Sequence, residues 1–175
     1  LGEKGVKMSG GERQRVALAR LFFEDSSIVI LDEATSAMDN LTEKAVMKNI
    51  LERLHDKTLI IIAHRLETIK DVDVVLWATP VYYYNMSGQM KTLIDRLNPL
   101  FVSNYKFKDV YLIATAAEAD ETAINGTVTG LKGWIECLDK TNLKGIIKAV
   151  GVCNAKDVNN FKNYLSKAYE MGKAV

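Results

Sequence analysis

Short apolar runs alternate with longer amphipathic stretches along the whole chain. The runs are rich in β-branched residues, which is typical of buried strands, whereas apolar positions at helical spacing indicate helices. The predicted strands are Ser27–Leu31, Thr58–Ala63, Asp73–Ala78, Asp109–Thr115 and Gly145–Val152. The predicted helices are 9–23, Thr42–Leu54, Ser87–Leu97, Ala123–Leu138 and Val158–Met171, with a short helical turn at Leu66–Ile69.

This alternation predicts an α/β protein of three layers, α/β/α, with a five-stranded parallel sheet covered on both faces. We favour the strand order 2-1-3-4-5, and the order 1-2-3-4-5 is the rival. A length of 175 residues suits a single domain, residues 1–175, with one core. Ser9 and Glu12 have the spacing of a capping box, so we expect the first helix to begin there.

Composition excludes several classes of function. With 23 basic and 22 acidic residues, the chain has no broad positive field for nucleic acid or an anionic membrane. Cys137 and Cys153 have no ligand-like spacing, so we expect no metal site and no disulfide framework. No apolar run reaches about 18 residues and no signal peptide is visible. We therefore expect a cytoplasmic protein that is produced by recombinant expression. Because Leu1 is not Met, we expect a chain that was processed, trimmed or cut from something longer.

Three motifs follow one another in the first half of the chain: MSGGERQR at 8–15, IVILDEATSAMD at 28–39 and IIIAHR at 60–65. In this order and spacing, residues 1 to about 71 resemble the C-terminal part of an ABC-transporter nucleotide-binding domain. The first motif is similar to the ABC signature, with Met8 where Leu is usual. The second resembles the Walker B strand with its D-loop, and the third resembles the strand of the switch histidine.

The resemblance implies a role for each polar residue of these motifs. Asp32 would hold Mg²⁺ through water, Glu33 would polarise the attacking water and His64 would touch the γ-phosphate. Ser9, Gly10 and Gly11 would present N–H groups at a helix N-terminus to the ATP of a partner subunit, and Glu12 belongs to the same orphaned signature.

ATP itself is held in this family by a Gly-rich loop that ends in Gly-Lys-Ser/Thr, and the 175 residues contain no such loop. Phosphoryl transfer depends on positioning and on neutralising charge, and the phosphate cradle supplies both. We therefore expect no catalytic residue, no ATP hydrolysis, and Asp32, Glu33 and His64 left as orphaned ABC residues. The motifs would then persist as a capped helix and two core strands.

The second half carries a different motif, VDVVLWATPVYYYNMSGQMKTLIDRL at residues 72–97. A strand that ends in Thr-Pro-Val-Tyr, followed by Asn-Met-Ser-Gly and a helix, resembles flavodoxin-like NAD(P)H-dependent FMN reductases and iron–sulfur flavoproteins. The resemblance covers residues 73 to about 152 and, we expect, continues to the end of the chain.

This family implies an FMN site, with one loop lining the isoalloxazine ring and the segment 115–118 bordering it. Ligands of such sheets bind at the carboxyl ends of the strands, and tyrosine rings offer flat surfaces to a flavin. An equal alternative is that the three tyrosines only cap the sheet. The candidate residues are Thr79, Pro80, Val81, Tyr82, Tyr83, Tyr84, Asn85, Met86, Ser87, Thr115, Ala116 and Ala117.

The FMN phosphate has no well-suited loop. In flavodoxin-like folds it binds after the first strand, where Thr35 and Ser36 would donate hydrogen bonds but Asp32 and Glu33 would repel a dianion. Arg65 would favour phosphate if the second strand held the central place instead. We therefore expect no bound cofactor, or FMN held only weakly.

The segment DVDVV at 71–75 fits both families, so it marks the junction of an ABC-derived fragment, 1–72, and a flavodoxin-like fragment, 73–175. The first fragment supplies two of the predicted strands and the second supplies three, which together make the five strands of a flavodoxin-like sheet. We interpret the chain as an engineered chimera without evolved activity, and the alternative is an FMN-binding protein with residual reductase activity. We expect no obligate partner, with a homodimer left open because helix surfaces made for absent ABC domains are exposed.

Overall fold

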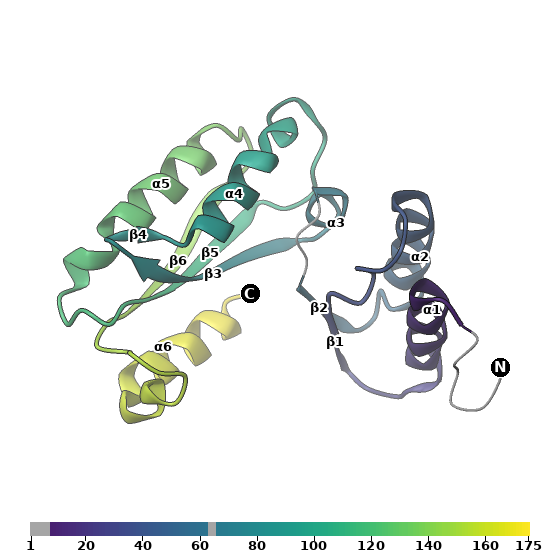
Figure 1. Cartoon of the computed structure of the whole chain (residues 1–175), viewed down its shortest axis with the longest axis horizontal. Coiled ribbons are helices and arrows are strands. Elements are labelled where there is room, and N and C mark those ends of the chain that lie inside the picture. Colours follow the sequence, from purple (N-terminus) through teal and green to yellow (C-terminus); the bar gives the residue numbers. More distant parts are fainter. Residues whose placement is uncertain (1–7, 63–65) are drawn as a thin grey trace. The chain divides into compact units, whose positions relative to one another are not determined.

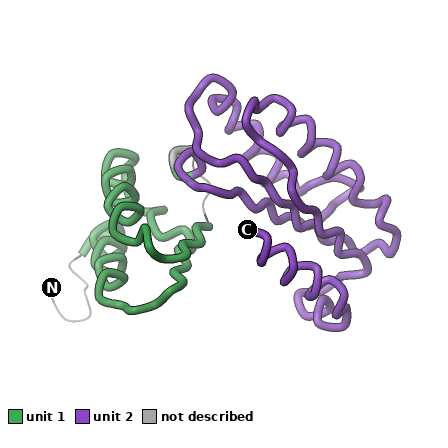
Figure 2. The backbone as a smooth tube through the Cα atoms, turned by 180° about the vertical axis from the view of Figure 1, so that it is seen from behind, with its two compact units in different colours: residues 1–68 green, residues 69–175 purple. Residues whose placement is uncertain are grey.

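The chain divides into two compact units, residues 1–68 and 69–175 (Figure 2). The structure is a computed structural model, which describes residues 8–62 and 66–175. Each unit contains its own β-sheet, with two strands in unit 1 and four in unit 2.

Unit 1 alternates helices with two parallel strands (Figure 1). Strands β1 and β2 pair in register, with Ile30 opposite Ile60. The capping box expected at Ser9 and Glu12 is confirmed at the start of the first helix. The elements are α1 (Gly10–Arg20), the 3-10 turn Leu21–Phe23, β1 (Ile28–Asp32), α2 (Asn40–Arg53), β2 (Thr58–Ile62) and, at the boundary of the units, α3 (Leu66–Lys70).

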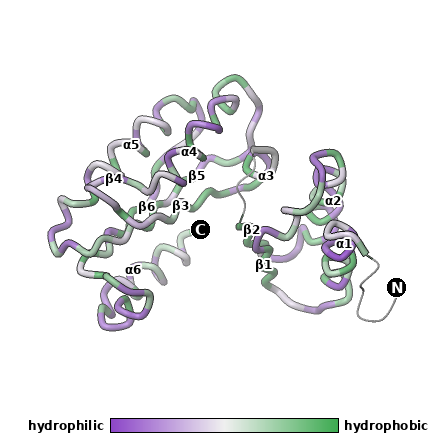
Figure 3. The backbone as a smooth tube through the Cα atoms, in the orientation of Figure 1, coloured by the Kyte–Doolittle hydropathy of each residue, from purple (hydrophilic) through white to green (hydrophobic). Residues whose placement is uncertain are grey.

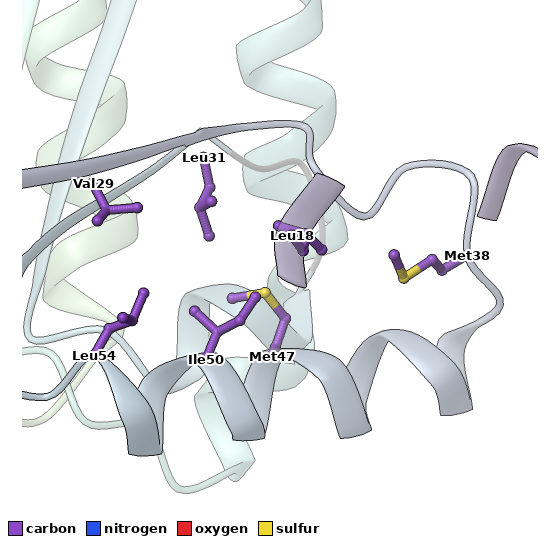
Figure 4. Packing of buried hydrophobic residues seen from close by; sticks show 7 residues of the cluster. All are labelled: Leu18, Val29, Leu31, Met38, Met47, Ile50 and Leu54. Carbon is purple, nitrogen blue, oxygen red and sulfur yellow. The ribbon is translucent and has the colours of Figure 1, made fainter. Parts of the chain in front are cut away.

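The core of unit 1 lies between its sheet and helices α1 and α2. Figure 4 shows the seven buried side chains, which are Leu18, Val29, Leu31, Met38, Met47, Ile50 and Leu54. Along β1 these buried residues alternate with Ile28 and Ile30, which are 59% and 62% exposed. Ile60 and Ile62 of β2 are exposed as well. Within unit 1, helices α1 and α2 cover one face of this sheet, and both of its strands are strongly hydrophobic (Figure 3). That helices cover its other face stays a prediction.

Unit 2 is a sheet of order β4-β3-β5-β6 between helices. Strands β3, β5 and β6 are parallel, and β4 is a short antiparallel addition to the end of β3. Figure 1 shows α4 and α5 on one face of this sheet and α6 on the other. The elements are β3 (Val74–Tyr82), β4 (Asn85–Met86), α4 (Gly88–Arg96), β5 (Asp109–Thr115), α5 (Asn125–Glu136), β6 (Asn142–Ala149) and α6 (Lys162–Lys173), with 3-10 turns at Asn98–Val102, Glu121–Ile124 and Asp157–Asn160.

Aromatic and aliphatic side chains fill the core of unit 2. Trp77 of β3 meets Trp134 of α5 edge-to-face, with ring centroids 5.5 Å apart. Phe107, Leu112 and Leu131 are fully buried. These contacts fix α5 on the sheet, and α5 in turn lies against β4 and β6.

The α/β class with parallel strands is confirmed, and all five predicted strands form. Strands β1 and β2 pair with each other, β3, β5 and β6 pair with one another, and β4 joins β3, so the strand count and order of one five-stranded sheet stay predictions. A local pattern identifies a segment as a strand, but the pairing partner is chosen by tertiary packing. That residues 1–175 form a single domain stays a prediction.

Two expectations drawn from composition concern the described residues. None of their helices combines the length and the hydrophobicity needed to cross a bilayer. Cys137 and Cys153 are both exposed free thiols. We find no group of three metal-ligating side chains within residues 8–62 and 66–175.

Candidate functional site

The signature-like segment begins α1 in a closed capping box. The Ser9 N–H donates to the Glu12 carboxylate at 2.8 Å, and the Ser9 hydroxyl oxygen accepts from the Glu12 N–H at 3.3 Å. The hydrogen bond from the Ser9 backbone, followed by that of its hydroxyl, holds the pKa of Glu12 below its ordinary value. The Ser9 N–H, one of the backbone donors that the resemblance assigns to a phosphate, is therefore already satisfied within the helix start itself.

Gln14 ties this helix to the loop after β1, a contact that sequence reasoning missed. Its side-chain amide donates to the Ser36 hydroxyl at 3.1 Å and accepts from the Ala37 N–H at 3.0 Å. A Cβ added to Gly11 would lie 3.2 Å from the Ala37 carbonyl, so α1 passes close to the same loop. The signature-like and D-loop-like segments thus form one packed block inside unit 1.

Asp32 and Glu33 lie at the carboxyl end of β1, as expected. Both side chains are exposed, and the Glu33 backbone has a φ of 44°, a left-handed conformation that is uncommon outside glycine. Its N–H donates to the Ile62 carbonyl at 3.0 Å and so links the ends of β1 and β2. His64 and Arg65 lie outside the described residues, so the structure places only two of the three orphaned ABC residues.

A small cavity opens beside this strand end. Its volume is about 90 Å³, against roughly 300–1,000 Å³ for typical ligand pockets. It is lined by Leu31, Glu33, Ala34, Thr35, Ser36, Glu43, Met47, Ile61, Ile62 and Thr68. The Thr35 hydroxyl, a candidate phosphate donor, instead donates to the buried Glu43 carboxylate at 2.7 Å. The cavity is too small for a nucleotide, and two carboxylates line it.

The tyrosine segment forms a tight turn at the carboxyl end of β3. Tyr82 pairs with Asn85 across the antiparallel β3–β4 ladder, which leaves Tyr83 and Tyr84 as the two turn residues. Their φ angles are 50° and 64°, and such two-residue turns with positive φ normally use Asn or Gly. A left-handed conformation costs roughly 1–2 kcal/mol per ordinary residue, so this turn is strained.

The tyrosine side chains point into solvent around this strained turn. Tyr83 is fully exposed, and Tyr82 and Tyr84 are 61% and 65% exposed. The Asn85 side chain accepts from the Met86 N–H at 2.8 Å, which orders the residue that follows the turn. Strained backbone and exposed aromatic rings at a strand end are typical of binding sites rather than of a turn optimised for stability.

Thr79 and Ser87 stabilise the segment around the turn through hydrogen bonds. The Ser87 N–H donates to the Thr79 hydroxyl oxygen at 3.1 Å, and the Thr79 hydroxyl donates to the Pro80 carbonyl at 2.8 Å. The Ser87 hydroxyl oxygen accepts from the Met90 N–H at 3.3 Å and caps α4. Thr79 and Ser87 are buried and hold the loop through these bonds, and their contact with a ligand stays a prediction.

The second candidate segment lies beside the first. In the parallel β3–β5 ladder Pro80 is opposite Thr115, so the segment 115–117 begins next to the tyrosine loop. Ala116 is buried and its N–H donates to the Ala149 carbonyl at 2.9 Å, whereas Ala117 is exposed. The structure therefore brings both candidate segments to one end of the unit 2 sheet. The ligand-accessible members are Pro80, Tyr82, Tyr83, Tyr84, Asn85 and Ala117.

Comparison with known protein families divides the chain in the same manner. A model of the family described as ABC transporter matches residues 1–36, and one described as NADPH-dependent FMN reductase matches residues 41–125. The chain joins segments similar to two families. The second match begins before the junction predicted at 71–75, and a helix followed by a hydrophobic strand, as in α2 and β2, suits both families.

Curated relatives match the ABC-like part. An uncharacterised ABC transporter ATP-binding protein of Bacillus subtilis, YwjA, is 52% identical over 79 residues, which is 45% of this chain and 14% of that protein. The β-(1→2)glucan export ATP-binding/permease protein NdvA of Brucella abortus is 46% identical over 96 residues, 55% of this chain and 16% of that protein. The chain thus spans less than a fifth of the length of either relative.

A solved structure matches the fold. The Trp repressor binding protein from Bacillus subtilis superposes with a TM-score of 0.52 at 21% identity, covering 79% of this chain and 93% of that one. At 21% identity the match supports a similar fold and nothing more. It is consistent with the flavodoxin-like class that the sequence predicts.

Proposed function

We propose that these 175 residues are an engineered chimera whose ABC-like segment has a structural role and does not hydrolyse ATP. The observation that carries this proposal is the cavity of about 90 Å³ lined by Glu33 at the end of β1, which has no room for a triphosphate. The absence of a Gly-Lys-Ser/Thr phosphate loop from the 175 residues agrees with it. The capping box and the Gln14 contacts use the signature-like residues to pack unit 1 instead.

Charge supports the same conclusion. Glu33 and Glu43 line the cavity, and a phosphate placed there would face both carboxylates. At a separation of about 4 Å and an effective dielectric constant near 20, each pair of like charges costs about 4 kcal/mol. A cation would have to neutralise this field before any nucleotide phosphate entered.

Turnover of ATP with Mg²⁺ tests the proposal. We expect phosphate release at the rate of buffer alone, and the same rate for Glu33→Gln, which keeps the size of the side chain and removes its charge. Any turnover by the unchanged chain that Glu33→Gln abolishes would refute a purely structural role for this segment. Turnover that persists in Glu33→Gln would point to a contaminating ATPase.

A second candidate function is weak binding of FMN at the tyrosine turn of unit 2. The strained backbone at Tyr83 and Tyr84 and their exposed rings support it, together with the match to NADPH-dependent FMN reductases. The segment from Thr115 lies beside the turn, as a second wall of such a site would.

Quenching of FMN fluorescence on titration with the protein tests this second function. Tyr83→Asn removes one ring but keeps a residue that tolerates a positive φ, so we expect binding about tenfold weaker with an unchanged fold. Tyr169→Asn, at an exposed tyrosine of α6, is the matched control and should bind as the unchanged chain does. Absence of saturable quenching in the unchanged chain would leave only the structural role.

A further inference from the structure

Helix α5 carries three glycines, and their surroundings differ sharply. A Cβ added to Gly133 meets no atom within 4 Å, and one added to Gly130 meets the flexible end of Met86 at 3.1 Å. A Cβ added to Gly126 would overlap the backbone carbonyl oxygen of Tyr84. Glycine in a helix interior costs about 0.5–1 kcal/mol in stability relative to alanine. The close approach of the Tyr84 carbonyl, which requires glycine at position 126, therefore needs an explanation.

The tyrosine turn gives that reason. Tyr83 and Tyr84 hold an unfavourable left-handed backbone, and the ladder that closes the turn contains only the pairs Val81–Met86 and Tyr82–Asn85. A two-pair ladder is a weak restraint on a strained turn. The second restraint is α5, whose first turn lies directly against the Tyr84 carbonyl and close to Asn85.

We propose that Gly126 is a positioning residue for the tyrosine turn, because its lack of a side chain lets α5 hold the Tyr84 carbonyl and so keep the strained turn in its binding shape. The proposal rests on FMN binding at this turn as the function that the shape serves. Gly126 itself does not contact the ligand. Its role is to bring the rigid helix close enough to restrain the backbone that carries the rings.

The helix is well suited to this role. It packs on the sheet through Trp134 against Trp77 and through the buried Leu131, and these contacts restrain the helix that carries Gly126. Next to Gly126, the Asn125 side chain accepts from the Lys148 ammonium of β6 at 2.8 Å. A shift of α5 away from the turn would have to disturb this packing, and we therefore expect the turn to move when a methyl group is added.

The test compares Gly126→Ala with Gly133→Ala in the full chain, by amide hydrogen exchange of residues 82–86 without ligand and by FMN titration. We expect exchange about tenfold faster and FMN binding about tenfold weaker in Gly126→Ala. Gly133→Ala adds the same methyl group to the same helix in open space and should match the unchanged chain in both measurements.

The outcomes distinguish the failure of FMN binding from the failure of the positioning role of Gly126. If the unchanged chain does not bind FMN, the flavin function fails, but the exchange comparison still tests the positioning role. Equal exchange in the two alanine variants would overturn that role. Fluorescence of Trp77 and Trp134 reports the fold of unit 2, and its loss in Gly126→Ala would also overturn the proposal, because the glycine would then be required for folding rather than for the turn.

Discussion

Asp39 shows how one side chain makes a helix depend on pH. Its carboxylate accepts from the N–H groups of Leu41 and Thr42 at 3.1 and 3.0 Å and from the Thr42 hydroxyl at 2.7 Å, which caps α2. These bonds, led by that from the Thr42 backbone, hold the pKa of Asp39 below its ordinary value. The stabilisation is therefore fully present above the unfolded pKa of about 3.9 and is lost as the pH falls through the lowered folded value.

We predict that Asp39→Asn reduces the acid-induced loss of stability, measured by urea unfolding at pH values above and below the ordinary pKa of aspartate. The asparagine side-chain oxygen still accepts from the Leu41 and Thr42 N–H groups but does not titrate, so this variant should remain folded at neutral pH. Asp39→Ala, which removes the cap, should be less stable already at neutral pH. An equally steep acid transition in Asp39→Asn and in the unchanged chain would contradict the prediction.

At this scale the sequence predicts caps well and strain poorly. The box of Ser9 and Glu12 follows from residue types and spacing alone, since both groups interact within one helical turn. The left-handed backbone at Tyr83 and Tyr84 was not predicted, because tyrosine disfavours that conformation and nothing in its own sequence imposes it. The restraints come from β4 and α5, and α5 begins about forty residues later in the chain.

Among the elements, α6 is fastened to the sheet by one buried tyrosine. The Tyr164 hydroxyl accepts from the Val150 N–H at 3.2 Å and donates to the Val150 carbonyl at 3.4 Å, next to the end of β6. We predict that Tyr164→Phe lowers the free energy of unfolding by about 1–3 kcal/mol, because the buried Val150 N–H loses its acceptor. Urea unfolding followed by far-UV circular dichroism measures the change.

Tyr169→Phe is the matched control for that measurement. It removes a hydroxyl from the same helix at a side chain that is 68% exposed, where water replaces the lost contacts. We expect a change within about 0.5 kcal/mol, as is usual for surface substitutions. If the two variants lose the same stability, the bond to Val150 does not fasten α6.

Hydrophobic periodicity predicted the helices and strands because burial on one face imposes it, but it placed some boundaries incorrectly. Strand β3 was expected to end at Ala78 and continues to Tyr82. Proline lacks an N–H and often ends a strand, yet Pro80 pairs with Thr115 in β5, and β4 reaches only Val81 and Tyr82 on the other side. The described structure thus places Pro80 in a strand whose second edge is open at that residue, where a missing donor costs little.

For the whole molecule, the sequence predicts strand positions better than strand pairing. The five expected strands formed and β4 was not expected, but pairing depends on which strand edges meet, and a local pattern carries no such information. The ABC-like and FMN-reductase-like matches are similarly local, because each describes a segment. These matches do not say whether the two segments unfold cooperatively, which has to be measured on the 175 residues together.

We predict that the two units nevertheless unfold in one transition. Unit 1 has 68 residues and a two-stranded sheet with Ile28 and Ile30 exposed on one face, and such a sheet is marginal when it folds alone. Ile50, which is 1% exposed in the core of unit 1, provides the perturbation, and Ile50→Ala should cost about 2–5 kcal/mol. Trp77 and Trp134, the two tryptophans of the chain, report on unit 2.

In a single folding domain, Ile50→Ala shifts the tryptophan transition to lower urea concentration, although both tryptophans lie in the other unit. Leu41→Ala, at a side chain of α2 that is 83% exposed, should leave the transition where it was. Circular dichroism and fluorescence should give coincident curves for every variant, as two-state unfolding requires. If Ile50→Ala leaves the urea midpoint of the tryptophan transition unchanged, the two units fold independently, because destabilising the core of unit 1 then has no effect on unit 2.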